Sequence, residues 1–330
     1  MSEESTGAEP PRKRRSVKKQ VLRWAITIVV VGVVGYFFSR SLIENWQELQ
    51  ANPVDFDWRW IVATVAFALA VPLTGLLWAR IIRVCDTDAR ISAVEAVAVQ
   101  CLSWVLKYIP GQVGSVANKV LWAKKKGISR TLVVISFIYE NVFLQLASIV
   151  PAVVILFLSL GPQIFGANVT TLVMPLLVLI PLALVMYRPL FHGILSRVAK
   201  RALKQDVPRE YFLSSWQSLR SAVEFLGPRI LNGVGFVLIA VTVSDVGPEM
   251  WLPFAAAYVL AGAIGILAIF VPSGIGVREA IIVLVLSQYI PVAQAIVISL
   301  IARLLSTVGD LGVAAVYLIT RRTIPKEIRP

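Results

Sequence analysis

The fold is decided by a stretch that occurs twice, Tyr108-Ile-Pro-Gly-Gln-Val-Gly114 and Phe270-Val-Pro-Ser-Gly-Ile-Gly276. Each copy reads aromatic, β-branched, Pro, three residues, Gly, and Pro110 and Pro272 lie 162 positions apart in a chain of 330 residues. Proline removes a backbone donor and glycine permits turns that other residues resist, so each copy should break the apolar helix in which it lies. In a membrane, such breaks are tolerated only where they face protein or a watery cavity. A matched pair, one in each half, indicates the substrate site of a transporter.

The composition around this pair is that of a membrane protein. Hydrophobic residues make up 57% of the chain and the mean hydropathy is +0.77, whereas a soluble domain of this length needs far more polar surface. We therefore expect an all-α, polytopic integral membrane protein. Helices of about 20 residues leave room for about six to eight crossings.

The apolar runs give the predicted order of segments. Crossings are expected at residues 21–38, 60–82, 131–158, 169–187, 230–243 and 292–320, and residues 251–271 lead into the second break. Residues 93–106 are too short to cross and lead through the first break into residues 113–123, which favours a re-entrant hairpin. Residues 277–289, after the second break, are short again.

Polar segments flank and interrupt this transmembrane domain of residues 21–320. Residues 1–20 are predicted to be a disordered basic cytoplasmic tail, and residues 321–330 a second cytoplasmic tail. Residues 188–229 form a basic cytoplasmic insertion. Within it, apolar residues at helical spacing over 190–203 favour an amphipathic helix on the membrane surface, with a solvated basic loop as the alternative.

The positions of the basic residues set the topology and argue against nucleic acid as the partner of a chain with net charge +13. Of 32 Lys and Arg, 27 fall in segments that this layout places on one side, among them the five in residues 119–130 and the eight in residues 188–229. The positive-inside rule then places both termini in the cytoplasm. Residues 93–123 dip in from the cytoplasm, so residues 251–290 must dip from outside or cross twice. Two dips give an inverted repeat.

Three basic residues remain at membrane depth, Lys107, Arg278 and Arg303. Each costs roughly 2.5–3.5 kcal/mol if unpaired, so acidic partners are expected. Glu140 lies 30 residues after Pro110 and Arg303 lies 31 after Pro272, and we predict that Glu140 and Arg303 approach each other across a central cavity. The alternative is that these charges hold helices together and take no part in binding substrate.

A helix should begin after each break, and its free N–H groups favour a phosphate. Lys107 and Arg278 flank these starts, although Lys107 could instead reach the membrane interface. The predicted substrate site comprises Lys107, Pro110, Gly111, Gly114, Glu140, Pro272, Gly274, Gly276, Arg278, Glu279, Arg303 and Asp310.

Enzyme chemistry is weakly supported. The sequence has no phosphate-binding Walker loop and one histidine, His192, in the polar insertion, which excludes a His-based metal site and a Ser-His-Asp triad. Cys85 and Cys101 are predicted to be unpaired packing residues. We expect no catalytic residues, metal or cofactor, and favour transport. An alternative is a membrane glycosyltransferase that uses a polyprenyl-phosphate sugar, with its acidic groups at Asp55, Asp57 and Glu249.

At these motifs the chain resembles the membrane domain of the lysylphosphatidylglycerol synthase/flippase family. The matching pieces are Lys107-Tyr-Ile-Pro-Gly111 with Gly114, a Lys-rich turn into Gly127-Ile-Ser129, Glu140, Pro272-Ser-Gly-Ile-Gly276, Arg278-Glu279, and Ala302-Arg303 with Asp310. The resemblance covers roughly residues 20–320. It implies a bacterial or archaeal plasma-membrane protein that moves an aminoacylated phospholipid between leaflets.

Two departures leave the substrate open. The second motif has Pro-Ser-Gly where the family often has Pro-Gly-Gly, and no soluble aminoacyl-transfer domain follows residue 320, so we expect that this chain does not load lysine onto lipid itself. An aminoacyl lipid made elsewhere, a glycolipid or a polyprenyl-phosphate carrier would each fit. A separate lipid synthase or glycosyltransferase is an expected partner. A third hypothesis is a non-catalytic protein that recruits a synthase through residues 188–229.

Overall fold

The computed structural model describes residue 43 and residues 56–106, 113–161, 169–203, 207–267, 274 and 276–330. Within these ranges the secondary structure is helical, as predicted, and contains no strand. The α-helices are α3 (Arg59–Cys85), α4 (Ala93–Val105), α5 (Val113–Lys126), α6 (Arg130–Leu160), α8 (Val169–Met186), α9 (Arg188–Leu203), α10 (Ser215–Glu224), α11 (Leu226–Val243), α12 (Pro248–Leu267), α13 (Val277–Leu286) and α14 (Val292–Thr323). The short 3-10 helices η2 (Arg209–Tyr211) and η4 (Lys326–Ile328) complete the description.

Five helical segments of the described part are long and apolar enough to cross a membrane. They are α3, α6, α12, α14 and the segment Arg209–Val243, which ends with α11. The helix pair α8 and α9, bent by 98° at their junction, would add a sixth. The chain is therefore an integral membrane protein, with a number of crossings close to the prediction. The predicted crossing at residues 21–38 lies outside the described residues.

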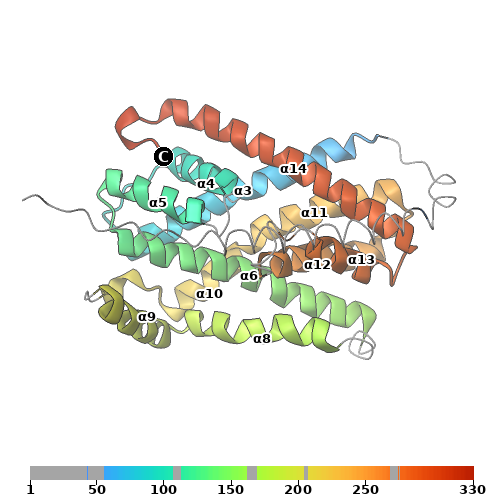
Figure 1. Ribbon diagram of the computed structural model, residues 1–330, viewed down its shortest axis with the longest axis horizontal. Coiled ribbons are helices and arrows are strands. Elements are labelled where there is room, and N and C mark those ends of the chain that lie inside the picture. Colours follow the sequence, from blue (N-terminus) through green and yellow to red (C-terminus); the bar gives the residue numbers. More distant parts are fainter. Residues whose placement is uncertain are drawn as a thin grey trace, which may run out of the picture.

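Two contacts fix the relative direction of α3 and α11. The Trp60 indole N–H, at the start of α3, donates to Thr242 at the end of α11, over 2.7 Å. At the opposite end, Arg80 of α3 pairs with Glu224, just before α11, over 2.5 Å. The two helices therefore run antiparallel and side by side through the middle of the molecule (Figure 1).

Each short helix that follows a break returns to the end of the molecule from which its partner came. Lys126 at the end of α5 pairs with Glu95 in the first turn of α4, over 2.8 Å. In the second half, Ser244 before α12 donates to Gln294, which follows α13 at the start of α14, over 2.6 Å. The pairs α4–α5 and α12–α13 are thus hairpins entered from opposite ends.

The packing between the halves is reciprocal. The first arm of each hairpin packs on the long helix of the other half, α4 on α14 and α12 on α6. Likewise α3 packs on α4 as α11 packs on α12 (Figure 1). The order α3–α6 is therefore repeated, upside down, by α11–α14. This is the arrangement that the matched breaks in the sequence predict.

Local sequence explains where several of these helices begin. Ser92 and Glu95 form a reciprocal capping box at the start of α4, and Ser214 and Gln217 do the same for α10. Each box satisfies two backbone N–H groups that a helix start leaves without partners. The first hairpin arm can therefore start abruptly at the end of the molecule that is rich in Lys and Arg.

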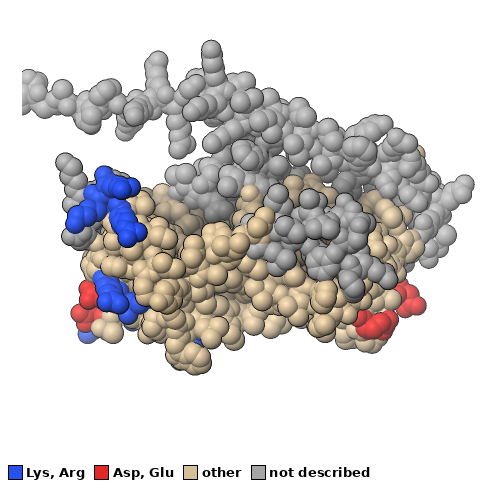
Figure 2. Space-filling model, turned by 90° about the horizontal axis from the view of Figure 1, so that it is seen from below, with Lys and Arg blue, Asp and Glu red and all other residues tan. Residues whose placement is uncertain are grey.

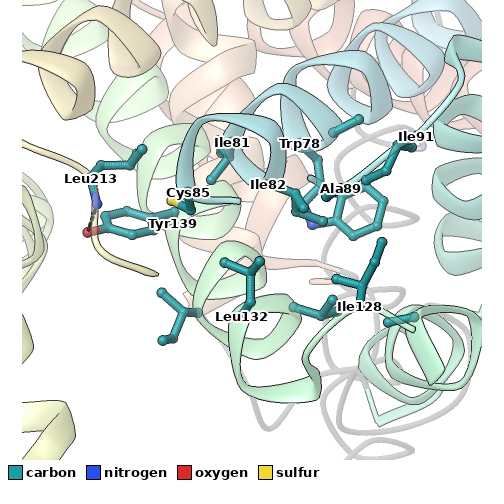
Figure 3. Close-up of a cluster of buried hydrophobic side chains, with 14 of the residues drawn as sticks. Trp78, Ile81, Ile82, Cys85, Ala89, Ile91, Ile128, Leu132, Tyr139 and Leu213 are labelled. Atoms are coloured by element: carbon teal, nitrogen blue, oxygen red, sulfur yellow. Dashed lines mark hydrogen bonds between the residues drawn. The ribbon is translucent and has the colours of Figure 1, made fainter. Parts of the chain in front are cut away.

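The predicted amphipathic helix is confirmed as α9, which begins at Arg188, two residues earlier than expected. Its Phe191 is buried against Tyr139 of α6, with ring centroids 5.1 Å apart. The Tyr139 hydroxyl in turn accepts from the Leu213 N–H over 3.2 Å, at the edge of an apolar cluster that includes Trp78 and Leu132 (Figure 3). The helix is therefore anchored to the body by an apolar contact. Its placement on a membrane surface stays a prediction.

Charge is distributed unevenly between the two ends. Among the described residues visible in Figure 2, Lys and Arg gather at the end where α5 finishes and α6 begins, with Asp or Glu beside them. At the opposite end, Asp and Glu are seen without Lys or Arg. This polarity agrees with the side that the positive-inside rule assigns to the cytoplasm.

The second break depends on a close contact between two glycines. Gly274 has φ +62°, and a Cβ at this position would lie 2.7 Å from the Gly265 Cα of α12. A left-handed backbone is costly for residues with a side chain. The chain can therefore fold back on α12 because position 274 lacks a Cβ, whereas a Cβ at Gly265 would make contacts no shorter than 3.6 Å.

We predict that Gly274→Ala lowers the free energy of unfolding by at least about 1 kcal/mol, because alanine resists the left-handed conformation and its Cβ meets Gly265. Gly262→Ala is the matched control, since a Cβ there meets nothing within 4 Å. Thermal unfolding in detergent micelles measures both. Equal stability of the two variants would contradict the proposed contact.

Candidate functional site

The two halves are built around ion pairs of opposite polarity. In the first half, Lys119 of the short helix α5 pairs with Glu140 of the long helix α6. In the second, Glu279 of the short helix α13 pairs with Arg303 of the long helix α14, over 3.7 Å. Each pair joins the arm after the break to the helix that follows it. The acid and the base have exchanged places between the repeats.

The pair in the first half is closed to solvent. The Lys119 side chain is 1% exposed and that of Glu140 is 4% exposed. Gln100 of α4 donates to the second Glu140 oxygen over 2.7 Å, and the Lys119 ammonium lies 4.3 Å from the centroid of the Trp78 ring. An opposite charge, an amide and an aromatic face therefore replace water around these two groups. The two charges of this site therefore balance each other.

The pair in the second half is more open and has more charges around it. Glu279 accepts from the Gly276 N–H over 2.6 Å and faces Arg303, whose side chain is 27% exposed. The neighbouring Arg278 guanidinium lies 4.2 Å from the centroid of the Tyr258 ring. Cations over aromatic rings are stabilised by the ring quadrupole without being neutralised. Positive charge is thus retained here.

A third arginine belongs to the same region. Arg229, in the first turn of α11, is half-buried and donates from Nε to the Leu144 carbonyl in the middle of α6, over 3.3 Å. Its helix, α11, packs on α12, which carries Tyr258. We refer to Arg229, Arg278 and Arg303 as the arginine cluster.

An aromatic layer supports the cluster. The Tyr258 ring stacks on Phe236 of α11, with centroids 4.6 Å apart, and on Phe67 of α3, with centroids 5.3 Å apart. Tyr258 is 4% exposed. The cluster therefore sits where α3, α11 and α12 meet, against an apolar wall in which electrostatic interactions are weakly screened.

The predicted meeting of Glu140 and Arg303 is wrong. Each residue has its partner within its own half, Lys119 for Glu140 and Glu279 for Arg303. The spacing from each break correctly predicts that Glu140 and Arg303 occupy equivalent positions on the long helices of the two halves. It could not reveal that the short helix of each half already supplies the opposite charge.

The sequence also predicts the wrong place for two further basic residues, Lys119 and Arg229. Both were assigned to cytoplasmic segments. Lys119 is instead in the buried ion pair, and Arg229 is inside α11. The signal that distinguishes Lys119 is the apolar stretch 120–123, which separates it from the exposed lysine run 124–126. For Arg229 it is the apolar run that begins directly at Ile230.

The expected anion at the second helix start is supplied by the chain itself. The Gly276 N–H, which was predicted to be open to a phosphate, donates to the Glu279 carboxylate. Glu279 thus caps α13 as the negative group favoured at a helix N-terminus. A ligand anion would have to use the arginine side chains.

The remaining predicted site residues are distributed as follows. Asp310 of α14 accepts from the Trp104 indole of α4 over 2.6 Å and so links the two halves. Gly114 is half-buried in α5, and Gly274 and Gly276 form the second turn with φ of +62° and +86°. Lys107, Pro110, Gly111 and Pro272 lie outside the described residues.

The structure also bears on the predicted roles of the cysteines and of the acidic residues Asp55 and Asp57. Cys85 and Cys101 are buried free thiols, as predicted. The described residues hold no group of three His, Cys, Asp or Glu side chains that could bind a metal ion. Asp57 accepts from the Arg59 N–H over 2.7 Å at the start of α3, which gives it a local structural role. Asp55 lies outside the described residues.

Comparison with known proteins adds one match. The family model described as the lysylphosphatidylglycerol synthase TM region matches residues 21–314, which is most of the chain. A comparison with curated proteins found no match.

We predict that Lys119→Met lowers the free energy of unfolding by about 3–5 kcal/mol, because it leaves the Glu140 carboxylate buried without its counter-charge. The double variant Lys119→Met/Glu140→Leu should be more stable than the single variant, since it removes both charges. Thermal unfolding in detergent checks the order.

Arg220→Ala is the control, because Arg220 is exposed and Glu224 keeps Arg80 as a partner. It should change stability by no more than about 0.5 kcal/mol. A Lys119→Met variant as stable as this control would show that the buried pair contributes nothing.

Proposed function

The chain belongs to the family of the lysylphosphatidylglycerol synthase transmembrane region, and from this membership we propose that it is a lipid flippase. It moves a phosphate-containing lipid between the leaflets of the membrane. The family supports a role in membrane lipid metabolism. The step from that role to transport rests on the charges inside the helical body.

The observation that favours transport is the arginine cluster. Arg303 pairs with Glu279, whereas Arg278 lies over the Tyr258 ring and Arg229 donates to a backbone carbonyl. Each unpaired charge at membrane depth costs roughly 2.5–3.5 kcal/mol. Such a cost is large beside a total stability of about 5–15 kcal/mol. Intramembrane charges of this kind usually mark a substrate pathway, and a lipid phosphate is the natural counter-charge.

The inverted arrangement supplies a route for the lipid. The α4–α5 and α12–α13 hairpins enter from opposite ends, and each packs on the long helix of the other half. Repeats related in this way can rock about a central site and open it to one side at a time. A headgroup bound at the arginine cluster would then pass between the leaflets while its charge stays in contact with the arginines.

Orientation and partners follow from the charge distribution. We place the Lys- and Arg-rich end, with both termini, in the cytoplasm of a bacterium or archaeon, and the chain in its plasma membrane. A separate lipid synthase or glycosyltransferase supplies the lipid. The basic α9 region is the surface that would face such a partner or the anionic headgroups.

We predict that the protein, reconstituted into phosphatidylcholine vesicles, accelerates leaflet exchange of a tail-labelled phospholipid. The test panel comprises phosphatidic acid, phosphatidylglycerol and lysyl-phosphatidylglycerol. Exchange is measured as loss of fluorescence to a membrane-impermeant reductant. Arg303→Ala should slow exchange at least about tenfold, since hydrogen bonds to charged groups contribute roughly 1.5–3 kcal/mol.

Arg322→Ala is the matched control, because Arg322 lies on the same helix but is exposed near its end. It should exchange lipid at the wild-type rate. Rates no faster than in protein-free vesicles for every lipid of the panel would refute the flippase proposal.

A further inference from the structure

A cavity of about 430 Å³ lies at the Lys- and Arg-rich end of the molecule, where the segment that follows α14 packs against α5 (Figure 1). Sites for small ligands usually have volumes of about 300–1,000 Å³. No residue of the arginine cluster lines this cavity, which is therefore a separate feature of the structure. The residues that line it are Asn118, Leu121, Trp122, Lys124, Lys125 and Pro330.

One wall of the cavity is formed by the chain beyond α14. Lys125 of α5 donates to the Arg329 carbonyl over 2.5 Å, which holds this segment against α5. The Pro330 carbonyl accepts from the Tyr317 hydroxyl over 3.4 Å, so its main-chain oxygen already has a donor. The segment lies beyond residue 314, where the match to the family model ends. The cavity is thus built in part by residues that the family match does not cover.

Three residues that line the cavity carry hydrogen-bond donors without an acidic partner. Trp122 is 0% exposed, and its indole N–H has no acceptor among the described residues. Lys124 is exposed and has no ion-pair partner in that part of the chain, and Lys125 is bound to a backbone carbonyl, which carries no charge. Buried N–H groups in native proteins nearly always have an acceptor. A ligand that brings negatively charged oxygens would supply what these three groups lack.

The remaining wall is apolar and is rigidly supported. The Trp122 ring packs on Trp78, with centroids 5.8 Å apart, and Asn118 holds the same helix to α4 by donating to Ser103 over 3.0 Å. Leu121, by contrast, is 62% exposed. A free phosphate would leave the Leu121 side chain in water, whereas a lipid would cover it with an acyl chain. The combination of ammonium groups and exposed apolar surface therefore favours a lipid.

We propose that this cavity binds an anionic phospholipid of the cytoplasmic leaflet. The lipid phosphate lies against Lys124 and Lys125 and accepts from the Trp122 indole. An acyl chain covers Leu121. The site is at the Lys- and Arg-rich end of the molecule, which we place in the cytoplasm, and anionic headgroups attract basic residues at that surface. The inference does not rest on the proposed transport function, because none of the arginines of the cluster takes part in it.

Binding of short-chain lipids to the purified protein in detergent, followed by native mass spectrometry, tests the proposal. Dioctanoyl phosphatidylglycerol should bind at least about tenfold more tightly than dioctanoyl phosphatidylcholine, whose headgroup has no net charge. Equal binding of the two lipids would overturn recognition of an anion. Inorganic phosphate at the same concentration should displace less than about a tenth of the phosphatidylglycerol. Displacement of half or more of it would assign the cavity to a soluble anion and overturn the lipid proposal.

Lysine variants locate the bound lipid. Lys124→Gln/Lys125→Gln should weaken phosphatidylglycerol binding at least about tenfold, because it removes both ammonium groups. Arg83→Gln/Arg90→Gln is the matched control, since it removes two exposed positive charges that do not line the cavity. It should bind within about twofold of the wild type. A control that binds as weakly as the lysine variant would show that overall charge alone recruits the lipid, contrary to the proposal.

Trp122→Phe tests the indole separately. It keeps an aromatic ring and removes an N–H that has no acceptor in the described protein, so the affinity for phosphatidylglycerol should fall at least about threefold. Unchanged affinity would overturn the proposed role of the indole. Lys124 and Lys125 are exposed, so the lysine variant requires no repacking of the core and remains decisive if Trp122→Phe is unstable.

The same comparison made in an Arg303→Ala background separates this cavity from the arginine cluster. The difference of about tenfold between the lysine variant and its control should persist there. If the difference disappears, the bound lipid belongs to the arginine cluster and the cavity proposal is overturned. Leaflet exchange is measured in parallel. Lipid binding that depends on the two lysines, without exchange, refutes the flippase and leaves this site standing.

Discussion

The structure depends on balancing charge inside an apolar body. Each repeat places a charged residue on its long helix, Glu140 in one half and Arg303 in the other, and each supplies the counter-charge from the short helix after its own break. The hairpins are therefore tied electrostatically to the helices that follow them. Since burying either partner alone is costly, the pairs help to define where the short helices pack.

The same constraint distinguishes the two halves. The first pair is closed to solvent, and Gln100 and Trp78 contact it. The second pair has Arg278 and Arg229 near it and is partly exposed. A pseudo-symmetric scaffold thus holds an asymmetric distribution of charge. In the first half, Glu140 supplies the negative charge that pairs with Lys119. In the second half, the phosphate of the proposed substrate would supply negative charge to the arginines.

The two halves hold each other through reciprocal packing of their hairpins. The arms α4 and α12 each lie on the long helix of the opposite half, and the Trp104–Asp310 hydrogen bond joins the two across that interface. The Gly265–Gly274 contact lets the second break approach α12 closely enough to place Arg278 over Tyr258. Small residues at the break therefore set the position of the charged ones.

The sequence by itself determined the helical membrane class, the positions of most crossings, the two matched breaks and the equivalence of Glu140 with Arg303, because hydropathy, Pro/Gly interruptions and spacing are local properties of the chain. Only the tertiary structure decided which charges meet. Lys119 and Arg229 look like members of basic cytoplasmic segments until packing turns them inward, and Glu279 looks available to a ligand until its carboxylate is found capping Gly276. Partner choice depends on which helix faces oppose each other across the fold, and no spacing along one chain encodes that.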